Sequence, residues 1–212
     1  MLFIRNYGNI FGKIQNLNTM IKSKQDYIFY LQADKTALGG AARQGTLARL
    51  ISPHPIYKFQ KLLRKCEYYK NCKKDILSKV YYVFLKRKFK LMSMRLGFSM
   101  HENNFGPGLA IVHYGTIVIN ANARIGANCR IHPSTCVGAS GGSPKAPVIG
   151  DNVYIAPGVK IYGDIKLANN IATAANAAIG SSFEEENIMI GGVPAKKIKE
   201  IDITKIITHI KK

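Results

Sequence analysis

Between residues 109 and 180, apolar side chains recur at every sixth position. One row, almost wholly aliphatic, runs through Ile119, Ile125, Ile131, Val137, Ile149, Ile155, Ile161, Leu167, Thr173 and Ile179. A second row, which begins four residues further on, contains Ala123, Cys129, Thr135, Val153, Val159, Ile165, Ile171 and Ala177. Neither a helix of period 3.6 nor a half-buried strand gives such a recurrence.

A solenoid accounts for this period, because each face contributes a short strand and the chain turns a corner at every sixth residue. Gly or Ala directly follows several members of the first row, which lets the backbone turn tightly. The rows therefore predict a mainly β fold, a parallel β-helix with large aliphatic side chains stacked inside. The alternative is a β-rich sandwich in which the spacing arises by chance.

The front of the chain has helical spacing instead. It predicts helices over about 23–37, 56–72 and 75–96, with Ser23 at the first start and Gly97 at the last stop. Glycines at 39, 40 and 45 and the stretch 52–55 separate the first two helices. We expect a loose N-terminal extension (1–21), an α-helical domain (22–97), a β-helix domain (98–197) and a C-terminal tail (198–212). Whether translation starts at Met1 or at Met20 stays open.

Within the repeats, the pattern lapses over GASGGSPKAP, residues 138–147, although the row members on either side keep their register. This stretch predicts a loop that leaves one corner of the solenoid. Three glutamates at 184–186 indicate a solvated turn, 188–190 a strand, and 191–197 a second turn before a short helical or extended tail.

The charge is concentrated in the front half. The 212 residues carry a formal charge of +19, and residues 1–100 hold 20 basic against 4 acidic side chains. Basic residues between 73 and 90 alternate with aromatic ones, which suggests peripheral contact with an anionic membrane or a lipid-linked substrate. A solvated helical face that steers an anionic ligand explains them as well. No nucleic-acid motif accompanies them.

The four cysteines have no zinc spacing, and they favour a reducing, cytoplasmic setting. The first twenty residues lack the unbroken apolar run of a signal peptide, and no later run is long enough to span a bilayer. We therefore expect a protein of the cytoplasm, at most at the inner face of the membrane.

Three stretches resemble the hexapeptide-repeat acyltransferases: FGPGLAIVHYGTIVINANARIGANCRIH, APVIGDNVYIAPGVKIYGDI and GGVPAK. The resemblance covers roughly 98–200 and is strongest to the serine acetyltransferase-like branch, including members that acetylate surface polysaccharides. It implies a left-handed β-helix after an N-terminal α-helical region. It also implies homotrimers that bind acetyl-CoA between neighbouring coils, with a dimer of trimers through the front helices as a further possibility.

His113, in IVHYG, matches the family's catalytic histidine. Acetyl transfer to a hydroxyl needs a base that removes the proton as the oxygen attacks, and imidazole titrates near neutral pH. The alternative is a histidine that merely caps the solenoid. A catalytic imidazole needs a partner that fixes its tautomer. Glu102 is the only nearby carboxylate, with a backbone carbonyl or a surface role for Glu102 as the alternatives.

Two departures from serine acetyltransferases bear on the acceptor. Val112 replaces an aspartate that helps to hold the amino acid's ammonium group, and Lys145-Ala146 replaces an Arg-His pair of the long loop. An amino acid would lose charge partners there, which is costly, whereas a sugar hydroxyl needs only hydrogen bonds. His132 and Lys145 are expected to contact the acceptor. Only two histidines lie in the coils, so we expect no metal.

For the cofactor, the resemblance assigns Ala156, Gly158, Ala174 and Ala175 to the pantetheine arm, although Thr173-Ala174-Ala175 departs from the usual Gly-Ala pair. Lys196 and Lys197 are expected to meet the nucleotide phosphates.

The sequence thus predicts an acetyl-CoA-dependent O-acetyltransferase that acts on a sugar hydroxyl, or on a lipid-linked saccharide, in surface-polysaccharide biosynthesis. Serine O-acetylation for cysteine biosynthesis is the alternative. A non-catalytic scaffold is the alternative of another class.

Overall fold

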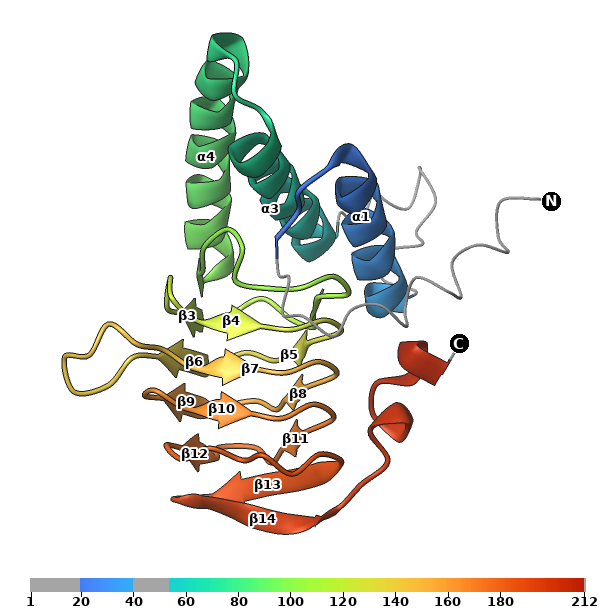
Figure 1. Ribbon diagram of the computed structural model, residues 1–212, viewed down its shortest axis with the longest axis vertical. Coiled ribbons are helices and arrows are strands. Elements are labelled where there is room, and N and C mark those ends of the chain that lie inside the picture. Colours follow the sequence, from blue (N-terminus) through green and yellow to red (C-terminus); the bar gives the residue numbers. More distant parts are fainter. Residues whose placement is uncertain (1–19, 40–53, 212) are drawn as a thin grey trace.

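The computed structural model describes residues 20–39 and 54–211. The predicted extension up to residue 19, the glycines at 40 and 45, and the loop residues 52 and 53 lie outside these ranges. A layer of helices stands on one end of a stack of short strands (Figure 1). The helices are α1 (Lys24–Leu38), α3 (Pro55–Cys72) and α4 (Ile76–Leu96).

Local capping explains where these helices begin and end. The side chains of Ser23, His54 and Asp75 each accept a hydrogen bond from a backbone N–H in the first turn of the helix that follows. Gly97 ends α4 in the left-handed conformation, at φ 78°, which costs glycine little. The three helices therefore lie close to their expected ranges.

The strands form the three faces of a prism. They are β1 (Phe98–Ser99), β2 (Ala110–Ile111), β3 (Ile117–Ile119), β4 (Arg124–Ile125), β5 (Arg130–Ile131), β6 (Thr135–Gly138), β7 (Val148–Ile149), β8 (Tyr154–Ile155), β9 (Lys160–Tyr162), β10 (Lys166–Leu167), β11 (Ala172–Thr173), β12 (Ala178–Ile179), β13 (Ile188–Gly192) and β14 (Ala195–Glu200). The three sheets have the orders β1-β3-β6-β9-β12, β4-β7-β10 and β2-β5-β8-β11-β13-β14. All pairings are parallel except that of β13 with β14. This is the predicted parallel β-helix.

Both sixfold rows lie inside the prism, as predicted. No member of the first row is more than 3% exposed, and none of the second more than 6%. Successive coils approach so closely that a Cβ at Gly126 or Gly150 would lie within 2.9 Å of the backbone of the next coil. Glycine is thus required at these two corners by the spacing of the coils.

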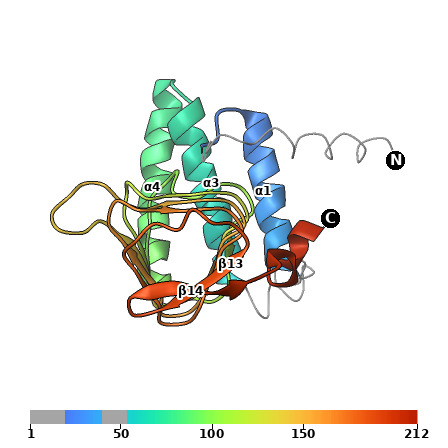
Figure 2. The same ribbon diagram turned by 60° about the horizontal axis from the view of Figure 1, so that its bottom comes forward.

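Two details differ from expectation at the C-terminal end. The stretch 191–197 is the end of a hairpin, because β13 continues to Gly192 and β14 begins at Ala195, whose Cα lies opposite that of Gly192. The antiparallel β14 covers the last coil, so the strands extend to Glu200. Two short 3₁₀ helices follow, η3 (Ile203–Lys205) and η4 (Thr208–Lys211). Figure 2 shows β14 across this end of the prism.

The loop between β6 and β7 leaves the prism at one corner, as its composition predicts (Figures 1 and 2). Val137 and Ile149 on its two sides remain buried, so the insertion does not change the register of the coils.

A fully buried Arg64 joins the helices to the first coil. Its guanidinium donates hydrogen bonds to Asp34 of α1 at 2.8 and 3.1 Å, and to Glu67 of α3 at 3.0 Å. It also donates to the carbonyl oxygens of Phe105 and Gly106 at 2.9 and 2.6 Å. Burial opposes its charge, but the two carboxylates outweigh this effect and raise the pKa of Arg64 above its ordinary value.

We expect Arg64→Met to lower the free energy of unfolding by about 3–5 kcal/mol, because Asp34 and Glu67 would stay buried without their cation. Urea denaturation measures the loss. The matched control is Lys58→Met, at an exposed position of the same helix, which should change stability little. A loss below about 1 kcal/mol for Arg64→Met would show that the network does not hold the helices on the prism.

Candidate functional site

Successive coils turn the same corner after β2, β5, β8 and β11, and the backbone keeps these corners in register. The N–H of Val112 donates to the carbonyl of Ile131 at 3.1 Å, and that of His132 donates to Ile155 at 3.1 Å. One coil on, the N–H of Ala156 donates to Thr173 Oγ1 at 2.9 Å. We call this column of residues 112–114, 132–133, 156–158 and 174–176 the histidine corner.

The His113 side chain lies on the outside of the prism, exposed at the end of the column nearer the helices. Its ring centroid is 6.4 Å from that of His132, and the His132 ring is 5.1 Å from that of Tyr154. His132 therefore lies opposite Val112 in the neighbouring coil, and it is one position away from lying opposite His113. Tyr154 belongs to this group but was missed from sequence, because it lies in a strand and only the pairing of β5 with β8 brings it to His132.

The surroundings of the His132 imidazole disfavour its protonated form. Burial, the positive charge of Arg130 and the neighbouring His113 together lower the pKa of His132. Its Nε2 atom is buried without a hydrogen-bond partner among the residues described.

The Glu102 side chain faces helix α4. It is buried, and it accepts hydrogen bonds from Lys86 and from the Tyr82 hydroxyl, both on α4. Burial works against its ionisation, but the hydrogen bond and charge of Lys86 hold the pKa of Glu102 below its usual value. These contacts tie α4 to the first coil. The role of Glu102 as the partner of His113 stays a prediction, and no described residue hydrogen-bonds to the His113 ring.

The structure brings the four small cofactor candidates into one strip. Ala156, Gly158, Ala174 and Ala175 occupy the next two coils of the histidine corner. Gly191 continues the strip, since a Cβ placed on it would lie 2.6 Å from that of Ala174. Four coil spacings of about 4.8 Å separate the His113 coil from that of Gly191, so the corner from His113 to Gly191 is roughly 19 Å long.

The two lysine candidates differ in their surroundings. Lys196 lies opposite Gly191 on β14, at the far end of the strip, and it is exposed. Lys197 is already engaged: its ammonium group lies 2.5 Å from Glu185 and 3.7 Å from Glu200. In the described part of the chain, Lys196 has no such ion pair and is the better placed of the two to meet an anion.

Lys145 is not at the histidine corner of its own chain. It lies in the loop between β6 and β7, at the opposite edge of the β3-β6-β9 face, and its ammonium group is 2.6 Å from Asp164. Both side chains are exposed. Within one chain the residues of this loop do not line the surface around His113.

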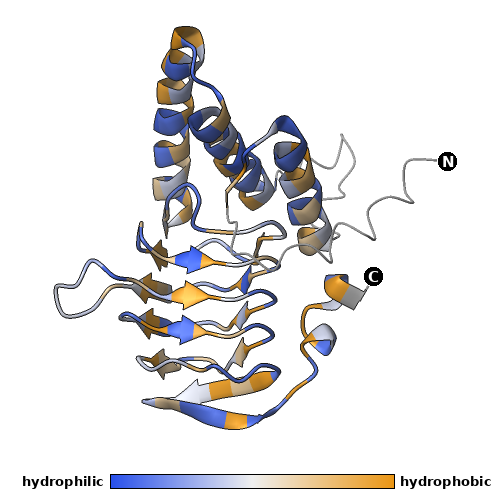
Figure 3. Cartoon of the chain, in the orientation of Figure 1, coloured by the Kyte–Doolittle hydropathy of each residue, from blue (hydrophilic) through white to orange (hydrophobic). Residues whose placement is uncertain are grey.

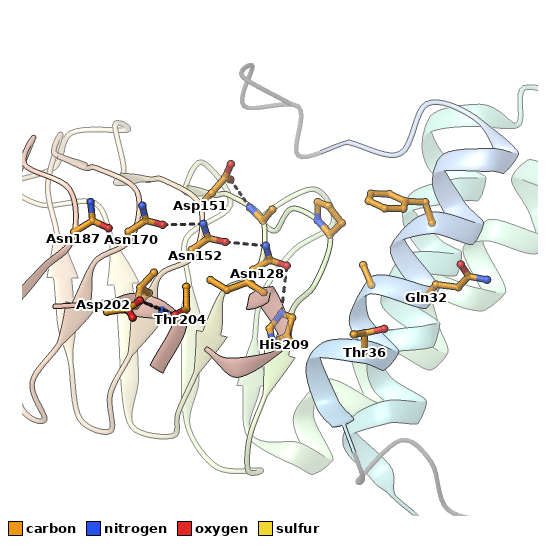
Figure 4. A pocket seen from close by; sticks show the side chains of 16 residues that line it. Gln32, Thr36, Asn128, Asp151, Asn152, Asn170, Asn187, Asp202, Thr204 and His209 are labelled. Atoms are coloured by element: carbon orange, nitrogen blue, oxygen red, sulfur yellow. Dashed lines mark hydrogen bonds between the residues drawn. The ribbon is translucent and has the colours of Figure 1, made fainter. Parts of the chain in front are cut away.

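A cavity of about 620 Å³ lies at another corner, between α1, the corner asparagines and the C-terminal tail (Figure 4). Asn128, Asn152 and Asn170 form a ladder there, with side-chain amide hydrogen bonds of 2.8 and 2.9 Å. Each has a φ near +57°, which asparagine tolerates better than most residues. Because these amides already pair with one another, we assign the ladder to the turning of the coils.

The described residues contain no group of three or more His, Cys, Asp or Glu that could hold a metal ion. The histidine corner presents an exposed imidazole, a second imidazole whose pKa is lowered and, further along, a strip of backbone with small side chains.

No family model matches the chain. Its fold is a left-handed β-helix with an N-terminal helical region, as in several solved serine acetyltransferases. A serine acetyltransferase of Neisseria gonorrhoeae superposes with a TM-score of 0.60 at 24% identity, over 84% of this chain and 68% of that one. One of Brucella abortus, solved with coenzyme A, has a TM-score of 0.60 at 22% identity, over 87% of this chain and 72% of that one.

The sequence relatives are serine acetyltransferases too. The chain is 31% identical to the enzyme of Staphylococcus epidermidis over 122 residues, 56% of this chain and 57% of that one. It is 32% identical to the Staphylococcus aureus enzyme over 107 residues, 49% of this chain and 50% of that one. The chain thus spans between half and three fifths of the length of these curated relatives.

These relatives overturn the expectation of a saccharide acceptor, since they carry the name that stood as the alternative. The structure explains the error. Part of the argument rested on Lys145 and Ala146, but their loop leaves the prism at a corner away from His113. Within one chain, the replacement of the Arg-His pair therefore does not change the surface around His113.

We expect the stability of the protein to fall on acidification through the ordinary histidine pKa of 6.5. A pKa lowered in the folded state means that the unfolded chain binds more protons below 6.5, so stability rises with pH there. His132, His101 and His209 all contribute in this direction. The urea midpoints at pH 7.5 and 5.5 measure it, and His132→Asn should reduce the difference. An unchanged difference in that variant would contradict the assignment.

Proposed function

We propose that this protein transfers the acetyl group of acetyl-CoA to the hydroxyl group of serine. The observation that supports the proposal is the position of His113, exposed outside the prism at the same corner that carries a strip of small residues two coils further on. Such a strip leaves room for an extended thiol-bearing arm along the coil edges, and the imidazole stands where that arm would end.

His113 acts as the general base. It accepts the proton of the serine hydroxyl while the oxygen forms a bond to the thioester carbonyl carbon. The carbon–sulfur bond then breaks, and the CoA thiolate leaves with the proton that the imidazolium returns. Atoms and charge balance, since O-acetylserine and CoA thiol are the products. Burial, Arg130 and His113 lower the pKa of His132, which disfavours a second positive charge beside the imidazolium that forms on His113.

CoA binds with its pantetheine arm along Ala156, Gly158, Ala174 and Ala175. Backbone groups at a coil edge can pair with an extended ligand much as they pair with an added strand. Lys196, exposed at the end of the strip, meets the phosphates. The Brucella abortus serine acetyltransferase, which shares this fold, was solved in complex with coenzyme A.

Serine is proposed as the acceptor because the relatives in sequence are named for it. Val112 offers no charge to the ammonium group of an amino acid, so that charge partner must come from elsewhere. We propose a homotrimer, in which the loop between β6 and β7 of one subunit reaches the histidine corner of the next. The exposed pair of Lys145 and Asp164 carries one charge of each sign, as the serine zwitterion does.

We place this activity in the cytoplasm. All four cysteines are free thiols, and a reducing compartment keeps them so.

The first experiment measures release of CoA thiol from acetyl-CoA with L-serine as acceptor. We expect turnover with serine, and His113→Ala should lower kcat by roughly two to four orders of magnitude. His209→Ala, in the C-terminal tail, is the control and should retain activity. Near-normal turnover in His113→Ala would remove the base from the mechanism. Absence of both CoA binding and thiol release would favour a scaffold.

The second experiment tests the phosphate contact by titration calorimetry with CoA. Lys196→Gln should weaken binding by about five- to tenfold, because an exposed charge-assisted hydrogen bond is lost. Lys199→Gln removes an equal charge from the same exposed strand and should leave the affinity within about twofold. Equal affinities in the two variants would separate Lys196 from the cofactor.

A further inference from the structure

The α4 helix has a second apolar face that nothing in the described structure covers. Its inner side packs against α3 and the first coil through residues such as Leu85 and Phe89. The opposite side exposes large apolar side chains, each between 44 and 82% exposed: Ile76, Leu77, Val80, Val83, Phe84, Leu91 and Met94. We call these seven residues the outer face of α4. Figure 1 shows α4 at the edge of the helical layer, and Figure 3 shows its apolar turns.

The spacing places these residues on one side of the helix. At 3.6 residues per turn the seven positions fall within an arc of about 120° along the whole helix. An apolar face of this size is uncommon on a soluble protein and marks a surface that meets a partner.

Basic side chains border the outer face on both sides. Lys79 and Lys90 lie along one edge, and Lys88 and Arg95 along the other, while Arg87 lies within the face. The helix itself contains no acidic residue. Lys73 and Lys74, just before α4, add two more positive charges at its N-terminal end, where Asp75 is the N-cap.

This charge pattern distinguishes between the occupants. A second copy of the same helix would bring its own basic borders against these, and the repulsion would oppose the apolar contact. An anionic lipid surface complements both parts, because the apolar side chains enter the acyl boundary while lysine and arginine stems extend to the headgroups. None of the described helices is long and apolar enough to cross a bilayer.

We propose that the outer face of α4 docks the protein on an anionic membrane surface, with the helix lying in the plane of the headgroups. The contact is peripheral and reversible. It leaves the histidine corner outside the membrane contact, because that corner belongs to the prism and not to α4. The proposal does not depend on the identity of the acyl acceptor.

Sedimentation with vesicles tests the proposal. The full chain is mixed with sucrose-loaded vesicles of phosphatidylcholine alone, or of phosphatidylcholine with 30 mol% phosphatidylglycerol as a chosen composition. We expect binding to the anionic vesicles only, weakened by salt. Removing three border charges in Lys79→Gln/Lys88→Gln/Lys90→Gln should lower the partition coefficient roughly a hundredfold, about fivefold for each charge.

Two control sets make the result specific. Lys166→Gln/Lys199→Gln/Lys205→Gln removes the same charge from exposed positions on the prism and tail and should lower binding far less. Val83→Ser/Phe84→Ser should lower binding at least tenfold through the lost apolar contact, whereas Val193→Ser/Ile198→Ser, at exposed apolar positions of the hairpin, should not. Circular dichroism verifies that each variant is folded.

Three outcomes would overturn the proposal. The first is absence of binding to anionic vesicles by the unchanged protein. The second is an equal loss in the α4 and control sets, which would indicate attraction by net charge alone. The third is self-association that Val83→Ser/Phe84→Ser abolishes, measured by light scattering without lipid, which would assign the outer face to a second copy.

Discussion

The buried guanidinium of Arg64 is the contact on which the arrangement of the two halves depends. A solenoid has two open ends, and at the end where the chain enters, the backbone groups and apolar interior of the first coil would meet water. Here the helical layer closes that end, and Arg64 reaches from α3 to two carbonyl oxygens of the first coil while Asp34 and Glu67 neutralise it. The Asp34 carboxylate also accepts the N–H groups of Gly108 and Leu109. Without Arg64, the carboxylates of Asp34 and Glu67 would be buried without a cation, and the carbonyl oxygens of Phe105 and Gly106 would lose these hydrogen bonds.

Stacking of the coils then turns spacing along the chain into distance in space. Because each coil repeats above the next at about 4.8 Å, residues far apart in sequence come to one corner. His113, His132 and Ala174 come together in this way, and no single stretch of sequence shows it. The same constraint places the asparagine ladder at a different corner, where it serves the turn of the backbone.

The two surfaces proposed for function lie on different parts of the molecule. The histidine corner belongs to the rigid prism, which can hold an imidazole in a fixed position beside a strip of small residues. The outer face of α4 belongs to the helical layer, and its seven apolar side chains contribute nothing to the core. The outer face of α4 can therefore contact a membrane surface while the histidine corner remains open to substrates in solution.

The sixfold rows by themselves determined the parallel β-helix, because only a regular solenoid buries every sixth residue, and capping residues such as Ser23 and Gly97 set the helix ends. His113 and the small residues of the strip could also be named from the sequence, since they match motifs of the family that the chain resembles. Only the tertiary structure could reveal Arg64, whose partners come from helix α1 and from residue 105 onward, and Tyr154, which meets His132 through strand pairing. It also decided that Lys145 lies away from His113 and that Glu102 pairs with α4. A pattern along the chain records local periodicity, whereas these contacts depend on which corner and which helix face each other after folding.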